Sequence, residues 1–151
     1  MLISDLLTLE TIIPDLKATG KKQALQELAS YASAQLGIED RLILDVLLER
    51  ERLGSTGVGE GVAIPHGKLL QLDKIYLLFA RLVKPIPFDS CDNRPVDLMC
   101  LLLTPENAGG DHLTALAKVS RLFRNQKVCS LLRGSENAET IYSAILESEQ
   151  S

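Results

Sequence analysis

The chain has 151 residues, 46% hydrophobic and 24% charged, which suits one compact domain that buries about two-thirds of its extended surface. Its 16 basic and 20 acidic residues give a formal charge of −4, and only 4% of the residues are aromatic. Nucleic acid is not expected as a partner, because phosphate neutralisation and base stacking both lack their usual residues. A mildly acidic surface suits a basic protein partner better.

The sequence carries no signal for membrane insertion or secretion. No stretch reaches the roughly 20 uninterrupted apolar residues that a membrane helix requires, and the start MLISDLLTLE has no basic region. We therefore expect a cytoplasmic protein. Cys91, Cys100 and Cys129 are odd in number and lack CxxC spacing, so neither a disulfide framework nor a metal site is predicted.

The N-terminal part predicts a short edge strand and then a helix. Residues 11–16 are rich in β-branched side chains and are broken by Pro14, which favours a strand at the edge of a sheet. Apolar residues recur at helical spacing over residues 21–36, and Gly37 is a natural C-terminal stop.

A second helix is predicted from about Glu39 to Leu53, ended by Gly54. Its buried stripe contains Ile43, Val46 and Leu47. Arg50 lies on the same stripe, so its guanidinium should emerge at the edge of the buried face, where the helix ends.

Two nearly continuous apolar runs, residues 75–83 and 96–104, predict central strands covered by helices on both faces. Between them, Pro85, Pro87 and the polar segment DSCDNRP predict a turn-rich connection. The order of helices and strands therefore predicts a mixed α and β fold built around one sheet.

The C-terminal part predicts a third helix capped by Asp111, a break at Asn125, a short helical piece through Leu132, and a final helix capped by Ser135. The apolar positions of the third helix are Leu113, Leu116, Ala117, Val119 and Phe123. Those of the final helix are Ala138, Ile141, Tyr142 and Ile145.

The segment GSTGVGEG, residues 54–61, contains four glycines in eight positions, which lets backbone amides approach an anion. A flexible loop is the alternative. A P-loop requires Lys and then Ser or Thr directly after its last glycine, but Val62 and Ala63 follow Gly61. The dinucleotide-binding fingerprint requires a glycine at position 62 and therefore does not fit either. No nucleotide cofactor is therefore expected. The candidates for contact with a phosphoryl group are Gly54, Ser55, Thr56 and Gly57.

His66 is one of only two histidines and lies between Pro65, which fixes the backbone, and Gly67, which leaves the ring accessible. Imidazole is largely neutral near pH 7, so one ring nitrogen can attack phosphorus while a hydrogen bond holds the other. An ordinary turn histidine is the alternative.

His112 and Arg50 are the two residues predicted to lie beside His66. His112 falls at the start of the third helix, where positive potential favours a phosphoryl group. Arg50 borders the glycine loop, and its guanidinium could clamp phosphoryl oxygens. A half-buried structural histidine and a solvated arginine are the alternatives.

The segment RERLGSTGVGEGVAIPHGK, residues 50–68, closely resembles the signature of the fructose/mannitol type of enzyme IIA of bacterial phosphotransferase systems. The resemblance continues through PFDSCDNRPVDLMCLLLTPE and DHLTALAKVSRLF. It implies an α/β fold in one domain over residues 1–151, with a mixed β-sheet flanked by helices on both sides.

The resemblance also implies how the site residues act. His66 would be phosphorylated on its tele nitrogen by a small carrier of the HPr type, while Arg50 and His112 would steady the phosphoryl group, without metal or cofactor. Glu60 is a departure, because many relatives carry a neutral residue such as Asn there. Its carboxylate could repel a phosphoryl group unless the side chain points away.

Within the family the chain is most similar to the nitrogen-regulatory branch, whose phosphorylation state regulates target proteins. A regulatory phosphocarrier is therefore the first hypothesis. The alternatives are a sugar-uptake component that donates to a separate IIB, and a non-catalytic module whose loop binds an anion or a peptide. Whether the chain counts as an enzyme, and its oligomeric state, are left open.

Overall fold

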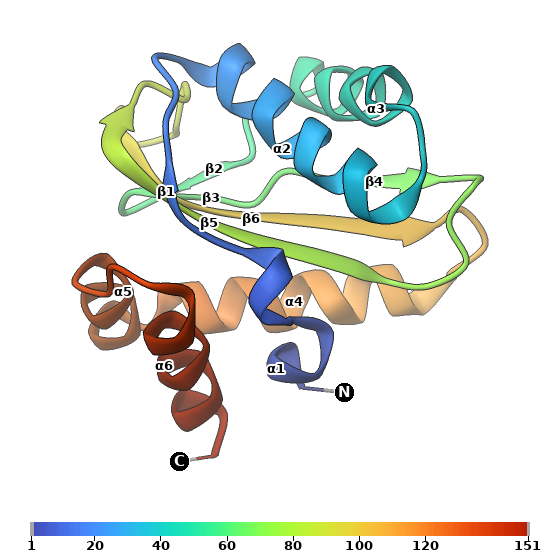
Figure 1. The fold of residues 1–151 in the computed structure, drawn as a ribbon. Coiled ribbons are helices and arrows are strands. Elements are labelled where there is room, and N and C mark those ends of the chain that lie inside the picture. Colours follow the sequence, from blue (N-terminus) through green and yellow to red (C-terminus); the bar gives the residue numbers. More distant parts are fainter. Residues whose placement is uncertain (1, 151) are drawn as a thin grey trace.

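The structure, a computed structural model that describes residues 2–150, contains a six-stranded mixed sheet with helices on both faces (Figure 1). The first half of the chain contains α1 (Ile3–Leu6), a 3₁₀ turn (Leu9–Thr11), β1 (Ile12–Leu16), α2 (Lys21–Leu36), α3 (Asp40–Arg52), β2 (Gly57–Gly59), β3 (Val62–Ala63) and β4 (His66–Leu69). The second half contains β5 (Tyr76–Ile86), β6 (Val96–Pro105), α4 (Gly110–Arg124), α5 (Gln126–Arg133) and α6 (Ala138–Gln150).

The strands run in the order β1-β5-β6-β3-β2, and β4 also pairs with β6. The pairs β5–β6 and β2–β3 are antiparallel, whereas β1–β5, β3–β6 and β4–β6 are parallel. This arrangement confirms the predicted fold class. It also places β1 at an edge, where Pro14 removes no ladder hydrogen bond from an inner strand.

The two faces of the sheet carry separate apolar layers. Helices α2 and α3 cover one face, and α4, α5 and α6 lie on the other (Figure 1). Successive residues of β5 and β6 alternate between the layers, so both strands are buried on both sides, as the continuous apolar runs predicted. In the second layer, Phe79 and Phe123 stack with ring centroids 5.8 Å apart.

One strand position of the sheet is interrupted just before His66. Both β3 and β4 pair with β6, β3 opposite Leu98 and Met99 and β4 from Leu102 onward. Ile64 and Pro65 lie between these two short strands. Proline has no N–H to donate to the ladder, which accounts for a break at this point. His66 is the first residue after it.

Helix α2 has the predicted bounds, and Gly37 ends it with a φ of +70°. Strand β5 continues through Pro85 to Ile86, past the predicted end at Val83 and into the predicted turn-rich connection. This end of β5 pairs with β6 only at Ile86 and Val96. A proline there interrupts no continuous ladder.

The predicted cap of α4 is wrong. Asp111 lies inside the first turn of this helix, whose N-cap is Gly109 with a φ of +62° and no side-chain cap bond. Among the apolar positions that predicted this helix, Leu113 and Ala117 are exposed. The buried residues of α4 are His112, Ala115, Val119 and Phe123.

The break at Asn125 is confirmed, and its side chain caps α5 by accepting bonds from the amides of Lys127 and Val128. The predicted cap at Ser135 is wrong, since its hydroxyl donates back to the carbonyl of Leu131. Asn137 accepts from the amide of Thr140 in its place. Within residues 2–150, no helix has the length and apolarity needed to cross a membrane.

Candidate functional site

His66 is partly exposed at the start of β4, and its ring is oriented by the preceding break in the sheet. The carbonyl oxygen of Ile64, which no strand neighbour uses, lies 2.8 Å from Nδ1. A carbonyl can only accept a hydrogen bond, so Nδ1 carries the ring proton. The lone pair of the neutral imidazole is therefore on Nε2.

Arg50 approaches that lone pair directly. Its Nε donates to His66 Nε2 over 3.2 Å, and its Nη1 donates to the carbonyl of Gly54 over 3.0 Å. As the sequence predicted, Arg50 lies at the edge of the buried face of α3, near the end of the helix. The second bond ties the guanidinium to the glycine loop, so the helix end and the loop together hold it against the histidine.

Gly67 makes this approach possible. A Cβ atom at Gly67 would lie only 2.4 Å from Cγ1 of Val46, one turn before Arg50 on α3. A larger residue at this position would force Val46 to shift. The sequence indicated that Gly67 leaves the His66 ring accessible, and the structure adds that it lets the arginine-bearing helix pack close.

His112 is the third residue of α4 and is 8% exposed. Its ring centroid lies 5.7 Å from that of His66, with 50° between the ring planes. Its Nδ1 shares a hydrogen bond of 2.6 Å with the hydroxyl of Thr104, which is fully buried at the end of β6. The two histidines and Arg50 line one cavity of about 720 Å³.

Burial favours the neutral form of both imidazoles. Burial lowers the pKa of His66, and the nearby Arg50 charge lowers it further, although the bond to Ile64 acts in the opposite direction. Burial also lowers the pKa of His112, with help from His66 and Lys68. A neutral ring near pH 7 is the form that can act as a nucleophile.

The glycine loop touches this cavity through Arg50. Gly54 accepts its hydrogen bond, while the Gly57 amide donates to Ser55 Oγ over 3.0 Å and the Ser55 hydroxyl donates to the carbonyl of Phe88 over 2.6 Å. These groups are thus engaged within the loop and its neighbour. Contact between Gly54, Ser55, Thr56 or Gly57 and a phosphoryl group stays a prediction.

Glu51, which the sequence did not single out, fixes the loop. Its carboxylate accepts from the Thr56 amide over 3.0 Å and from the Thr56 hydroxyl, and it pairs with Lys21 Nζ at 2.9 Å. The Glu51 side chain is 6% exposed. An acidic residue between two arginines at a helix end resembles surface charge in sequence, so only the fold identifies its role.

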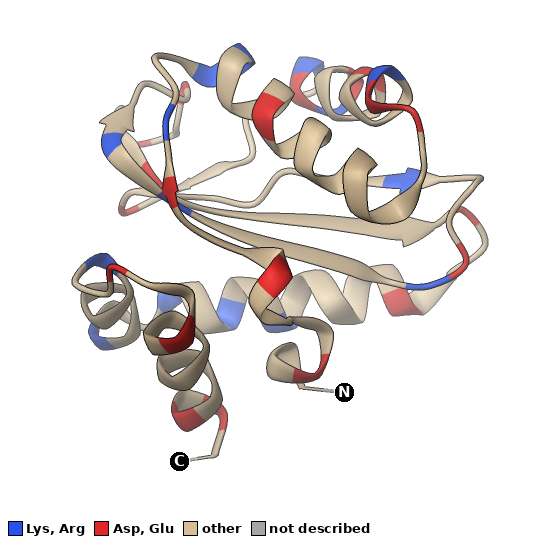
Figure 2. Ribbon diagram, viewed as in Figure 1, with Lys and Arg blue, Asp and Glu red and all other residues tan. Residues whose placement is uncertain are grey.

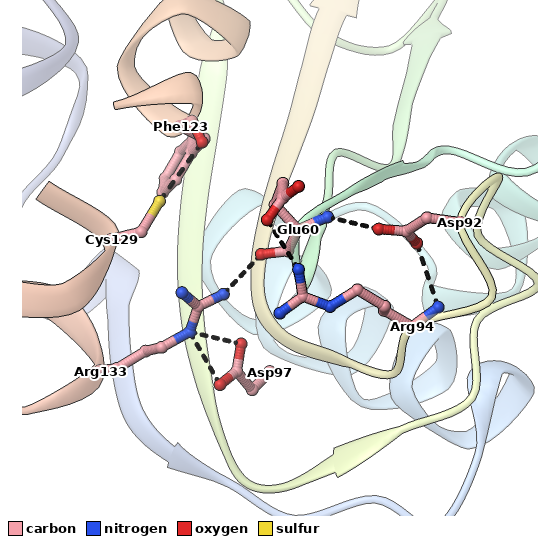
Figure 3. Close-up of polar contacts among 7 residues, drawn as sticks. All are labelled: Glu60, Asp92, Arg94, Asp97, Phe123, Cys129 and Arg133. Atoms are coloured by element: carbon pink, nitrogen blue, oxygen red, sulfur yellow. Dashed lines mark hydrogen bonds and ion pairs between the residues drawn. The ribbon is translucent and has the colours of Figure 1, made fainter. Parts of the chain in front are cut away.

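Glu60 does not face His66. It lies at the tip of the β2–β3 hairpin with a φ of +56°, and its carboxylate binds Arg94 at 2.7 Å (Figure 3). It lines a different cavity from the one that holds both histidines. The carboxylate is therefore directed away from the candidate site.

The chain matches one protein family over nearly its whole length. Residues 5–148 match the family model described as "Phosphoenolpyruvate-dependent sugar phosphotransferase system, EIIA 2". The chain therefore belongs to the EIIA 2 family and is a IIA component of a phosphotransferase system.

Its relatives confirm the predicted likeness to the nitrogen-regulatory branch. The chain is 56% identical to the nitrogen regulatory protein of Bradyrhizobium diazoefficiens over 96% of its own length and 95% of the relative. It is 36% identical to the nitrogen regulatory protein of Escherichia coli, over 97% of this chain and 91% of that relative.

Solved structures agree with this assignment. The crystal structure of the nitrogen regulatory protein IIA-Ntr from Neisseria meningitidis matches with a TM-score of 0.89 and 34% identity, covering 95% of this chain and 98% of the other. IIA mannitol from Escherichia coli matches at a TM-score of 0.77 and 20% identity, with 92% and 98% covered, which shows the shared fold.

Proposed function

We propose that this protein is a regulatory phosphocarrier that accepts a phosphoryl group from an HPr-type protein on Nε2 of His66. The observation that carries the proposal is the bond from Nδ1 to the Ile64 carbonyl, because it leaves Nε2 as the basic nitrogen and turns it toward Arg50. The tele position follows from this tautomer.

Phosphoryl transfer then needs only positioning and charge neutralisation. The Nε2 lone pair attacks the phosphorus of the donor's phosphohistidine in line, and the donor's N–P bond breaks with its electron pair returning to the donor ring. Arg50 leaves Nε2 as the phosphoryl group arrives and binds its oxygens. The hydrogen bond from His66 Nδ1–H to the Ile64 carbonyl stabilises the positive charge that the His66 ring gains on phosphorylation.

His112 steadies the same group from the other side. Its ring is close to His66, and the first turn of α4, which carries it, contributes the positive end of the helix dipole. Because the ring is buried and bonded to Thr104, it cannot rotate freely when the phosphoryl group enters.

The rim of the cavity suits a basic carrier. Asp45 and Glu49 line it together with Leu53, which is 82% exposed. Leu113, next to His112, is 69% exposed. Exposed apolar residues beside acidic ones favour docking of a carrier with an apolar patch and basic side chains. Such a partner would meet this protein in the cytoplasm.

The regulatory role rests on the similarity to nitrogen regulatory proteins. A second candidate function is the supply of a phosphoryl group to a separate IIB protein for sugar uptake. The chain is also 35% identical to a fructose-specific EIIA component of Haloferax volcanii, over 96% of this chain and 95% of that relative. Deletion of the gene separates the two. Loss of growth on fructose or mannitol would favour sugar uptake, and unchanged growth would favour regulation.

Labelling with phosphoenolpyruvate, enzyme I and an HPr-type donor tests the chemistry. The wild-type protein should acquire one acid-labile phosphate, and His66→Ala should acquire none. Undiminished labelling of His66→Ala, with the fold intact by circular dichroism, would refute the assignment of His66.

A further inference from the structure

A second cavity, of about 490 Å³, lies at the other end of α4 from His112. It is formed by the β2–β3 hairpin, the C-terminal half of α4 and the helix α5. Arg121 and Arg124 follow His112 by nine and twelve residues, which corresponds to roughly 14 and 18 Å along the helix axis. The cavity is thus separate from the histidine site.

Four arginines line this cavity, and two of them are already engaged (Figure 3). Arg133 Nε donates to both oxygens of Asp97 at 2.9 Å, and its Nη2 donates to the Glu60 carbonyl at 2.8 Å. Arg94 Nη1 binds the Glu60 carboxylate at 2.7 Å. These bonds hold the hairpin tip against α5 and build one wall of the cavity.

The other two arginines, Arg121 and Arg124, have no hydrogen bond or ion pair within the described residues 2–150. They are three residues apart on α4, so their like charges are neighbours and repel each other. Figure 2 shows Lys and Arg gathered on this part of α4 and on α5. The chain has a net charge of −4, so the positive charges of Arg121 and Arg124 are a local excess.

The remaining lining is partly apolar, with Val58, Ala117 and Phe123 among the arginines. The volume falls within the range of about 300–1,000 Å³ typical of small-molecule sites. Guanidinium groups bind phosphate oxygens in bidentate fashion, and an apolar surface beside them can accept a ring. Charge and shape together therefore fit a compact molecule with a polyphosphate group and an apolar body.

We propose that this cavity is a binding site for a small phosphorylated metabolite of nucleoside diphosphate size. Arg121 and Arg124 bind its phosphate groups, and the surface of Val58 and Ala117 contacts its body. Glu60 competes with the ligand for Arg94, since its carboxylate occupies that guanidinium in the free protein. The site does not depend on phosphorylation of His66.

Calorimetric titration at about 150 mM salt tests the proposal, with ADP and inorganic pyrophosphate as separate ligands. Saturable binding of ADP to the wild-type protein is expected. The double variant Arg121→Gln/Arg124→Gln should weaken it at least about tenfold. Glu60→Gln, which frees Arg94, should tighten it.

Arg41→Gln is the matched control, because Arg41 is an 82% exposed arginine of α3 that does not line the cavity. It should bind ADP like the wild-type protein. Absence of saturable binding, or equal weakening by Arg41→Gln and the double variant, would overturn the site. Pyrophosphate binding as tightly as ADP would overturn the assignment of the apolar surface.

Discussion

The Nδ1–H group of His66 donates to the carbonyl oxygen of Ile64, two residues earlier, over 2.8 Å. Ile64 lies between β3 and β4, outside both pairings with β6, so its carbonyl is available to the ring. A backbone irregularity thus fixes the protonation of the ring. The nitrogen that we propose as the nucleophile is therefore set by the path of the chain.

Replacement of Arg50 by Ala should slow phosphorylation of His66 by roughly 10- to 100-fold, because charge-assisted bonds to the phosphoryl oxygens are worth about 1.5–3 kcal/mol. The rate is measured with an HPr-type donor under single-turnover conditions. Arg52→Ala is the control, since Arg52 is exposed on the same helix and pairs only with Glu49. A rate for Arg50→Ala equal to that of the control would contradict the role of Arg50.

Thr104→Val should leave Nδ1 of His112 without its buried partner at nearly constant side-chain volume. We expect a loss of about 1–3 kcal/mol in the free energy of unfolding and slower phosphorylation of His66. Thr104→Ser keeps the hydroxyl and should restore the rate. If the Ser and Val variants accept phosphate equally slowly, positioning of His112 through this bond is refuted.

Gly67→Ala should push α3 away from β4 and carry Arg50 with it, since the new methyl group meets Val46. The expected cost is about 1–3 kcal/mol of stability, with a lower rate of phosphorylation. Adding Val46→Ala should recover part of both, because it removes the contacting group. Urea unfolding measures the stability, and kinetics with the HPr-type donor measure the rate of phosphorylation. If Val46→Ala recovers neither, the contact between residue 67 and Val46 is not the cause of the loss.

The pH dependence of stability should reflect both histidines. Burial lowers the pKa of His66 and of His112 below the ordinary value of 6.5, so the unfolded chain binds protons more readily than the folded one. Their contribution to the free energy of unfolding is constant above pH 6.5 and is lost progressively as the pH falls below it.

Urea unfolding between pH 5 and pH 8 measures this dependence. The double variant His66→Gln/His112→Gln should show a flatter profile just below pH 6.5 than the wild-type protein. An identical profile would mean that the two rings titrate alike in the folded and unfolded states.

Elements with a strong local pattern could be predicted from the sequence. Periodicity and a terminal glycine define α2, and unbroken apolar runs define the central parts of β5 and β6. Helix caps were harder to predict from the sequence. Ser135 and Asn137 are both good capping residues, and the tertiary context decides which of them caps α6.

The three candidate site residues, His66, Arg50 and His112, could be proposed from the sequence, whereas the residues that support them could not. Thr104 lies in an apolar strand and Glu51 in a charged helix end, so neither has a distinctive local pattern. Their partners come from other elements of the fold. Only the assembled structure could therefore identify them.

The position of the phosphoryl group on His66 tests the central claim most directly. Phosphorus and nitrogen NMR of the protein labelled by an HPr-type donor distinguishes the two ring nitrogens. The Nδ1 bond to Ile64 predicts a single phosphohistidine with phosphorus on Nε2. Phosphorus on Nδ1, or on His112 in place of His66, would contradict it.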